Sequence, residues 1–128
     1  MAYQYEQGEQ TALFNWADLM ETQYPDLHYM YHVPNEGKRN ARTGYALVRA
    51  GLKKGVPDVV LPVPHGEYVG LYIEMKYGKN RPTQEQKDWL AFLKSVGHYT
   101  DVAYNWQEAS EKILWYLKLP ARVHINQN

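Results

Sequence analysis

Residues 55–61, Gly55-Val56-Pro57-Asp58-Val59-Val60-Leu61, and residues 70–76, Gly70-Leu71-Tyr72-Ile73-Glu74-Met75-Lys76, organise the chain. Each run is short, rich in β-branched or large apolar residues, and bounded by Gly or Pro, a pattern that predicts a strand. The turn-like residues 64–67 between them predict a hairpin of strands 56–63 and 68–76.

Three ionisable residues interrupt these apolar runs. Alternate residues of a strand share a face, so Glu74 and Lys76 lie together, opposite the apolar residues of the same strand. Asp58 lies beside valines in a run with the composition of a buried strand. Desolvating such groups costs free energy unless a metal ion or the groups themselves compensate one another. For Lys76, a simple ion pair with Glu74 or Asp58 is the alternative to a catalytic role.

The order Pro-Asp, spacer, Glu-x-Lys resembles the catalytic signature of the PD-(D/E)xK nuclease superfamily. The wider pattern resembles the virus-type replication-repair nuclease (VRR-NUC) family, in particular its stand-alone viral members, from about Glu9 to about Tyr104. The residues that carry this resemblance are, in order, Glu9, Asn35-Glu36-Gly37-Lys38-Arg39, Gly55-Val56-Pro57-Asp58, Glu74-Met75-Lys76, and Thr83-Gln84-Glu85-Gln86 ahead of Trp89.

Length and composition predict one domain over residues 1–128, with a frayed tail over 120–128. No apolar run approaches the ~20 residues of a membrane helix, and the acidic start does not resemble a signal peptide. The absence of cysteine excludes disulfides and thiolate metal sites and fits an intracellular protein. A viral member would act in the cytoplasm of a bacterial host if it is phage- or prophage-encoded.

The net charge is zero, but the charges are unevenly distributed. Residues 1–37 hold six Asp or Glu and no Lys or Arg, and residues 38–57 hold six Lys or Arg and no acid. Such clustering can neutralise phosphates locally, or it can form a solvated helix face. The candidate DNA-binding residues are Lys38, Arg39, Arg42, Lys53, Lys54, Lys79 and Arg81.

Helices are predicted over about 6–22, 40–50, 83–96 and 106–118, and further strands over 28–33 and 98–104. Their order predicts an α/β fold with a mixed central sheet flanked by helices. The resemblance likewise implies a restriction-endonuclease-like core. The expected inward faces are Leu13, Trp16 and Met20; Thr43, Ala46, Leu47 and Ala50; Trp89, Leu90, Phe92, Leu93 and Val96; and Ile113, Leu114 and Leu117.

Two polar residues have structural as well as functional explanations. Glu9 lies on the inward stripe of the first helix, where the helix dipole also favours an acid. Thr83 and Gln86 form a predicted capping box, whereas the family resemblance makes Gln86 part of the site. Both roles of Gln86 are compatible, because a helix that begins near Glu74 places Gln86 near the site.

Oxygen ligands without cysteine point to Mg²⁺ or Mn²⁺, and the histidines show no ligand spacing (His28, His32, His65, His98 and His124). The resemblance implies that Asp58, Glu74 and the carbonyl of Met75 hold the ion, with Glu9 as a further ligand directly or through water. The bound ion polarises the scissile phosphate and activates a water, while Lys76 orients that water or stabilises the growing charge.

The lead interpretation is a metal-dependent DNA endonuclease for four-way (Holliday) or other branched junctions, as stand-alone viral members resemble junction resolvases. The alternatives are a non-catalytic nucleic-acid-binding domain of the same fold and a sequence-specific restriction enzyme. A chain of 128 residues has little room for base-reading insertions, while phosphate contacts suffice to recognise shape.

A homodimer is expected, because resolving a junction requires two cuts related by an approximate twofold axis. Twelve tyrosines and four tryptophans supply aromatic surface of the kind that is enriched at interfaces. The alternative is that these aromatic residues line the core and the DNA groove of a monomer.

Overall fold

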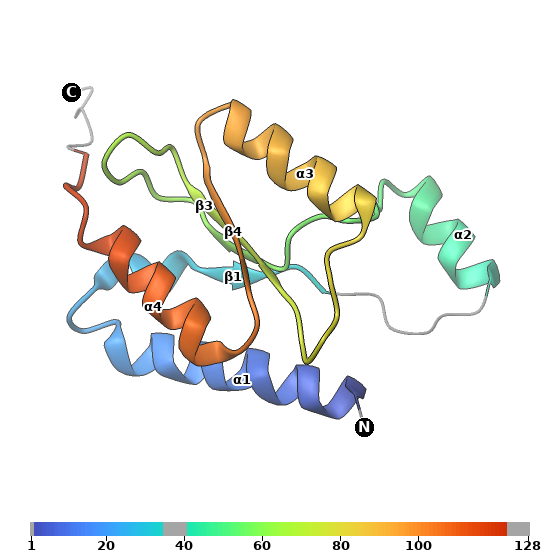
Figure 1. Cartoon of the computed structure of the whole chain (residues 1–128), viewed down its shortest axis with the longest axis horizontal. Coiled ribbons are helices and arrows are strands. Elements are labelled where there is room, and N and C mark those ends of the chain that lie inside the picture. Colours follow the sequence, from blue (N-terminus) through green and yellow to red (C-terminus); the bar gives the residue numbers. More distant parts are fainter. Residues whose placement is uncertain (1, 35–40, 123–128) are drawn as a thin grey trace.

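A four-stranded mixed sheet forms the centre of the computed structural model, which describes residues 2–34 and 41–122 (Figure 1). Strands β1 and β2 and strands β2 and β3 pair antiparallel, whereas β3 and β4 pair parallel. This confirms the predicted α/β class and the predicted hairpin. In sheet order the strands are β1 (Tyr31–His32), β2 (Val59–Leu61), β3 (Leu71–Met75) and β4 (Tyr99–Ala103).

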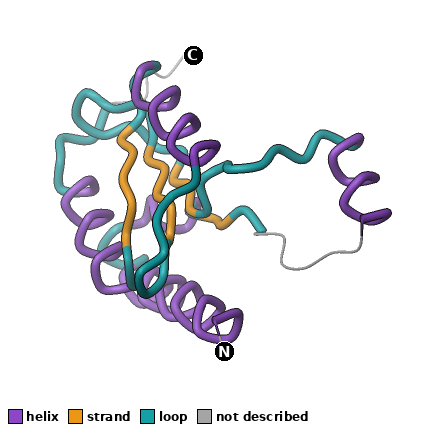
Figure 2. Tube along the Cα trace, turned by 45° about the vertical axis from the view of Figure 1, so that its right-hand side comes forward, coloured by secondary structure: helices purple, strands orange, loops and turns teal. Residues whose placement is uncertain are grey.

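Helices cover both faces of the sheet (Figure 2). On one face, α1 and α4 pack against each other and build the main core with the apolar side of β3, whereas α3 lies on the other face. The parallel β3 and β4 are joined through α3, as parallel strands require a crossover connection. The helices are α1 (Ala2–Met20), α2 (Ala41–Arg49), α3 (Gln84–Ser95) and α4 (Trp106–Leu117).

The predicted strand over 28–33 is mostly wrong. Residues Pro25–Tyr29 form a 3-10 helix, η1, and only Tyr31–His32 joins the sheet. Pro25 has a fixed φ that suits the start of a helix, and the turn of η1 buries Leu27 in the core. Burial of that side chain holds these residues out of the extended conformation.

Helix α2 forms where it was predicted, but its expected inward face is wrong. Ala46 and Ala50 are exposed and Leu47 is half-buried, because α2 projects away from the sheet and its flanking helices (Figure 2). The side chain of Thr43 lies outside the described part of the structure. On α3, Phe92 and Val96 are likewise exposed.

The C-terminal segment is attached to the hairpin turn as far as Arg122. The N–H of Gly66 donates to the carbonyl of Pro120 at 2.7 Å, and the Arg122 side chain donates to the carbonyl of Gly66 at 3.0 Å. These two bonds join residues 120–122 to the turn, and the frayed tail over 120–128 stays a prediction. Within residues 2–34 and 41–122, no helix combines the length and apolar character needed to cross a membrane.

The loop between α2 and β2 packs closely on the first turn of α3. Gly55 has a φ of +85°, and a Cβ at this position would lie 2.7 Å from the carbonyl carbon of Glu85 and 2.9 Å from the nitrogen of Gln86. The Trp89 indole N–H donates to the carbonyl of Lys54 at 3.0 Å. Gly55 therefore lets two backbone segments meet beside the strand that carries Asp58.

We predict that Gly55→Ala destabilises the protein more than Gly51→Ala does. Gly51 also has a positive φ, +106°, but a Cβ there meets nothing within 4 Å. Both changes cost about 1–2 kcal/mol for the left-handed backbone, and only Gly55→Ala adds about 1–3 kcal/mol from overpacking. Urea unfolding measures the difference, and equal midpoints for the two variants would contradict the close packing on α3.

Candidate active site

Asp58 and Glu74 face each other across β2 and β3. The register pairs Val59 with Ile73, so the preceding residue Asp58 lies opposite Glu74, on the side of the sheet away from the main core. Only 4% of Asp58 and 1% of Glu74 are exposed. The Met75 N–H donates to Oδ2 of Asp58 at 2.9 Å, which fixes the Asp58 carboxylate against β3.

Lys76 is the cationic member of this group. Its Nζ lies 3.7 Å from Oε2 of Glu74, and its side chain is 15% exposed. The ion pair that was the alternative to a catalytic role is therefore present, and part of the Lys76 side chain stays exposed. The single positive charge of Lys76 offsets only part of the free-energy cost of burying two carboxylates, because one cation faces two acids.

Burial raises the pKa values of both carboxyl groups. Desolvation is the largest cause for each, and for Glu74 the facing Asp58 carboxylate adds to it, raising the pKa of Glu74 to about 9. Lys76 opposes both shifts. Two carboxylates this close disfavour simultaneous ionisation unless a cation joins them.

The donor set fits a hard divalent cation. Oε1 of Glu74 is buried and accepts no hydrogen bond within the described residues. Mg²⁺ typically uses one or two carboxylates and keeps several waters, so a pair of acids suffices. No three His, Cys, Asp or Glu side chains form a metal-binding group in residues 2–34 and 41–122, so Asp58 and Glu74 stand as a pair.

A cleft of about 240 Å³ leads to Asp58 from the side of α3. Gln86 lines it, as do residues of the loop that packs on α3. Oε1 of Gln86 accepts from the N–H of Thr83 at 2.8 Å, and the Thr83 hydroxyl accepts from the N–H of Gln86 at 3.2 Å. The predicted capping box is thus confirmed, and the same geometry places Gln86 in the cleft with Asp58. The lining residues are Val33, Pro34, Gly51, Leu52, Lys53, Gly55, Val56, Asp58 and Gln86.

Glu9 has a different partner from the one expected. Its Oε1 accepts from the N–H of Trp106 at 3.0 Å, where α4 begins. A carboxylate at this end of a helix satisfies a free backbone donor and interacts favourably with the dipole. Among the described residues Glu9 forms no metal-binding group with Asp58 and Glu74, and its role as a further ligand, directly or through water, stays a prediction.

The candidate DNA-binding residues whose side chains the structure describes lie on two exposed loops, and one of them, Lys53, lines the cleft that contains Asp58. Lys53 and Lys54 are exposed on the loop from α2, and Lys79 and Arg81 are exposed on the loop from β3 to α3. Sequence patterns did not indicate the Trp89–Lys54 hydrogen bond that holds the first loop, because it joins residues 35 positions apart. Lys38, Arg39 and the side chain of Arg42 lie outside the described part of the structure.

Comparison with known proteins agrees with this geometry. The family model described as the VRR-NUC domain matches residues 2–106. A solved structure titled "VRR_NUC domain protein" is similar over 97% of this chain and 97% of its own, with a TM-score of 0.78 and 28% sequence identity. No curated protein matches the chain.

We predict that Glu74→Gln stabilises the metal-free protein at alkaline pH. A carboxyl whose pKa rises from 4.5 to about 9 on folding contributes stability that is present below about pH 4.5 and is lost as pH rises through about 9. The amide of the variant does not titrate, so it adds no such pH dependence of stability. Thermal melting in EDTA between pH 5 and 9 should show a difference in melting temperature between variant and wild type that widens with pH. A gap that stays constant, or one matched by the exposed control Glu67→Gln, would contradict the buried acid pair.

Proposed function

The chain belongs to the VRR-NUC family, and on this premise we propose that it is a metal-dependent DNA endonuclease that cuts at four-way or other branched junctions. Membership of the family implies nuclease activity. The observation that carries the proposal is the buried pair of Asp58 and Glu74, with Lys76 beside Glu74 and open to the surface.

Asp58 and Glu74 would hold the metal, Mg²⁺ or Mn²⁺, with the backbone carbonyl of Met75 and with Glu9 through water. When bound, such an ion polarises a phosphate and lowers the pKa of a coordinated water. The Met75 N–H bond keeps one Asp58 oxygen fixed, so the carboxylate does not need to reorganise on binding. Oε1 of Glu74, which accepts no hydrogen bond from another described residue, would gain the metal ion as its partner.

Lys76 would act on the reacting phosphate. Its side chain is mostly buried beside Glu74 but still partly exposed, so its ammonium group would orient the attacking water or stabilise negative charge that develops on the phosphate. Gln86, fixed by its capping bond, would present its remaining amide group to the cleft. The DNA backbone would be bound by Lys53, Lys54, Lys79 and Arg81, and by Lys38, Arg39 and Arg42.

We predict that Asp58→Asn lowers junction cleavage by at least about 100-fold, the usual range for losing one electrostatic contact to a transition state. DNA binding should persist, because the Asp58 carboxylate repels phosphate and its removal therefore takes away no attraction. Junction cleavage with Mg²⁺ or Mn²⁺ measures the first effect, and gel shift in EDTA the second. Asp18→Asn, at an exposed site on α1, is the control.

A melting series with Mn²⁺ separates the roles further, since an ion that binds only the folded state raises its stability. Wild type and Asp18→Asn should gain stability, and Asp58→Asn should not. Full cleavage by Asp58→Asn would overturn the metal site. A wild type that binds junctions but cuts with neither metal would instead favour the non-catalytic binding domain.

The same function leads us to propose a homodimer. One chain with one site makes one cut, whereas a twofold dimer presents two sites at a fixed separation to the two strands of a junction. Exposed aromatic residues are available for such an interface, among them Tyr31, Tyr45 and Trp115.

We predict a mass of about twice 15.0 kDa for the free protein in sedimentation equilibrium at micromolar concentration, and two protein chains per DNA in the complex with a junction. Sedimentation reports association without requiring activity. A free mass near 15.0 kDa together with one chain per junction in the complex would remove the dimer and favour a monomeric flap or nick endonuclease.

A further inference from the structure

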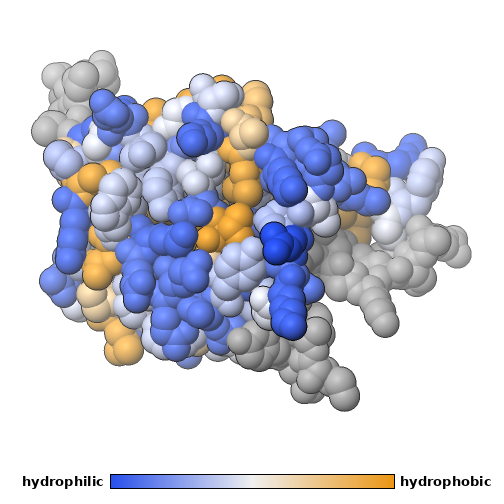
Figure 3. All heavy atoms as spheres, viewed as in Figure 1, coloured by the Kyte–Doolittle hydropathy of each residue, from blue (hydrophilic) through white to orange (hydrophobic). Residues whose placement is uncertain are grey.

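A second pocket lies where β3 and β4 end, beside the proposed catalytic site. It is a hollow of about 480 Å³ lined by Gly78, Lys79, Asn80, Arg81 and Tyr104. In Figure 1 the loop after β3 runs down beside the turn between β4 and α4, and Figure 3 shows hydrophilic surface over that loop. The volume is within the range of about 300–1,000 Å³ for pockets that bind small organic molecules.

The pocket combines cations with an aromatic ring. Neither Lys79 nor Arg81 forms an ion pair with another described residue, so both charges are available to a ligand. Tyr104 is 36% exposed, and Asn80 adds an exposed amide group. An aromatic ring for stacking beside cations for phosphate is the pattern by which proteins bind single-stranded nucleotides.

The register places this pocket one step from Lys76. Met75 pairs with Ala103, and the Lys76 N–H donates to the carbonyl of Ala103 at 2.8 Å, so Tyr104 follows directly on the neighbouring strand. Gly78 is two residues beyond Lys76, about 7 Å of extended chain. A nucleotide in the pocket would therefore adjoin a phosphate held at Lys76.

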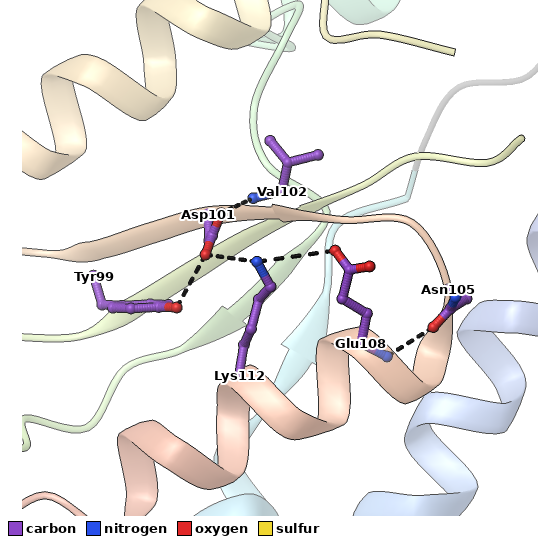
Figure 4. A network of polar contacts seen from close by, with 6 residues as sticks. All are labelled: Tyr99, Asp101, Val102, Asn105, Glu108 and Lys112. Atoms are coloured by element: carbon purple, nitrogen blue, oxygen red, sulfur yellow. Dashed lines mark hydrogen bonds and ion pairs between the residues drawn. The ribbon is translucent and has the colours of Figure 1, made fainter. Parts of the chain in front are cut away.

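Both walls of the pocket are held in place. On one side, the Asn80 N–H donates to the carbonyl of Tyr77 at 3.1 Å and closes a turn. On the other, Lys112 of α4 contacts Asp101 of β4 at 2.8 Å, and the Asn105 side chain accepts from the N–H of Glu108 at 2.7 Å (Figure 4). Tyr104 lies in the chain between Asp101 and Asn105, so its backbone is held in place on both sides.

We propose that this pocket binds one unpaired nucleotide of the DNA substrate next to the phosphate that is cut. Tyr104 stacks on the base, Lys79 and Arg81 neutralise the flanking phosphates, and Asn80 contacts the base edge. The inference rests on the proposed nuclease function and adds its substrate class, branched DNA in which a nucleotide beside the cut has left the helical stack. Continuous duplex offers the pocket no such base.

The test measures binding by metal-free protein in EDTA to a flap junction with 2-aminopurine as the unpaired nucleotide at the branch. Tyr104→Ala should bind about 5-fold to 100-fold more weakly than wild type and lose the quenching of the probe. Tyr104→Phe should retain both, because the ring remains. Tyr29→Ala is the matched control, an exposed tyrosine on η1, at the opposite edge of the sheet. Wild-type affinity and quenching in Tyr104→Ala would overturn the proposal, as would an equal loss on continuous duplex.

A second pair of variants tests the cations without touching a packed side chain. Lys79→Gln with Arg81→Gln should reduce the slope of log K against log salt by about 0.7 for each single-strand phosphate that the protein no longer neutralises. Lys94→Gln with Lys118→Gln, two exposed positions elsewhere, should leave the slope unchanged. An unchanged slope in the first pair would also overturn the proposal. If the protein cleaves junctions but Tyr104→Ala changes neither binding nor quenching, only this inference is overturned. If the probe is quenched but no junction is cut, only the nuclease proposal is overturned.

Discussion

Two carboxyl groups are buried against each other between β2 and β3, and the site depends on this unfavourable contact. Asp58 and Glu74 are nearly inaccessible, and a single ammonium, that of Lys76, lies beside them. Replacing such a buried pair with apolar residues of similar volume would cost little or no stability. The presence of the pair destabilises the fold unless a proton neutralises one of the two acids, as the raised pKa of Glu74 shows. If a divalent cation binds as proposed, stability and cation binding are linked through the same two side chains.

The backbone around this pair is fixed by hydrogen bonds and by close packing of one loop on α3. The Met75 N–H orients Asp58, Gly55 lets the preceding loop touch the start of α3, and Trp89 anchors that loop from the helix side. The Thr83 capping box then sets where α3 begins, and with it the position of Gln86 in the cleft. Because each contact is made by backbone or by a rigid side chain, the cleft keeps its shape while the charges within it change.

Strand alternation and capping patterns predicted correctly the features that depend on local sequence. The hairpin, the shared face of Glu74 and Lys76, and the role of Gln86 as a cap follow from spacings of one to three residues, and each is found in the structure. The failures have tertiary causes. Burial of Leu27 draws residues 25–29 into a 3-10 turn, and α2 exposes its apolar face because it projects from the fold. The bond from Trp106 to Glu9 joins residues 97 positions apart, a distance at which no local pattern gives a signal.

The neutral net charge conceals how the charges are arranged around the site. Lys53 and Lys54 lie on one exposed loop, where Lys53 lines the cleft that contains Asp58, and Lys79 and Arg81 lie on a second exposed loop. A phosphate backbone held beside Lys53 would approach Asp58, which repels it while it is ionised. With its pKa raised to about 9, Glu74 is protonated near neutral pH, so Asp58 and Lys76 together carry no net charge. In the proposed function, a divalent cation shared by both ionised carboxylates would bring that sum to plus one, since two acids and one such ion sum to zero and Lys76 adds a positive charge. The same ion would therefore supply the chemistry and draw the scissile phosphate toward the carboxylates, while the basic loops would hold the rest of the DNA without it.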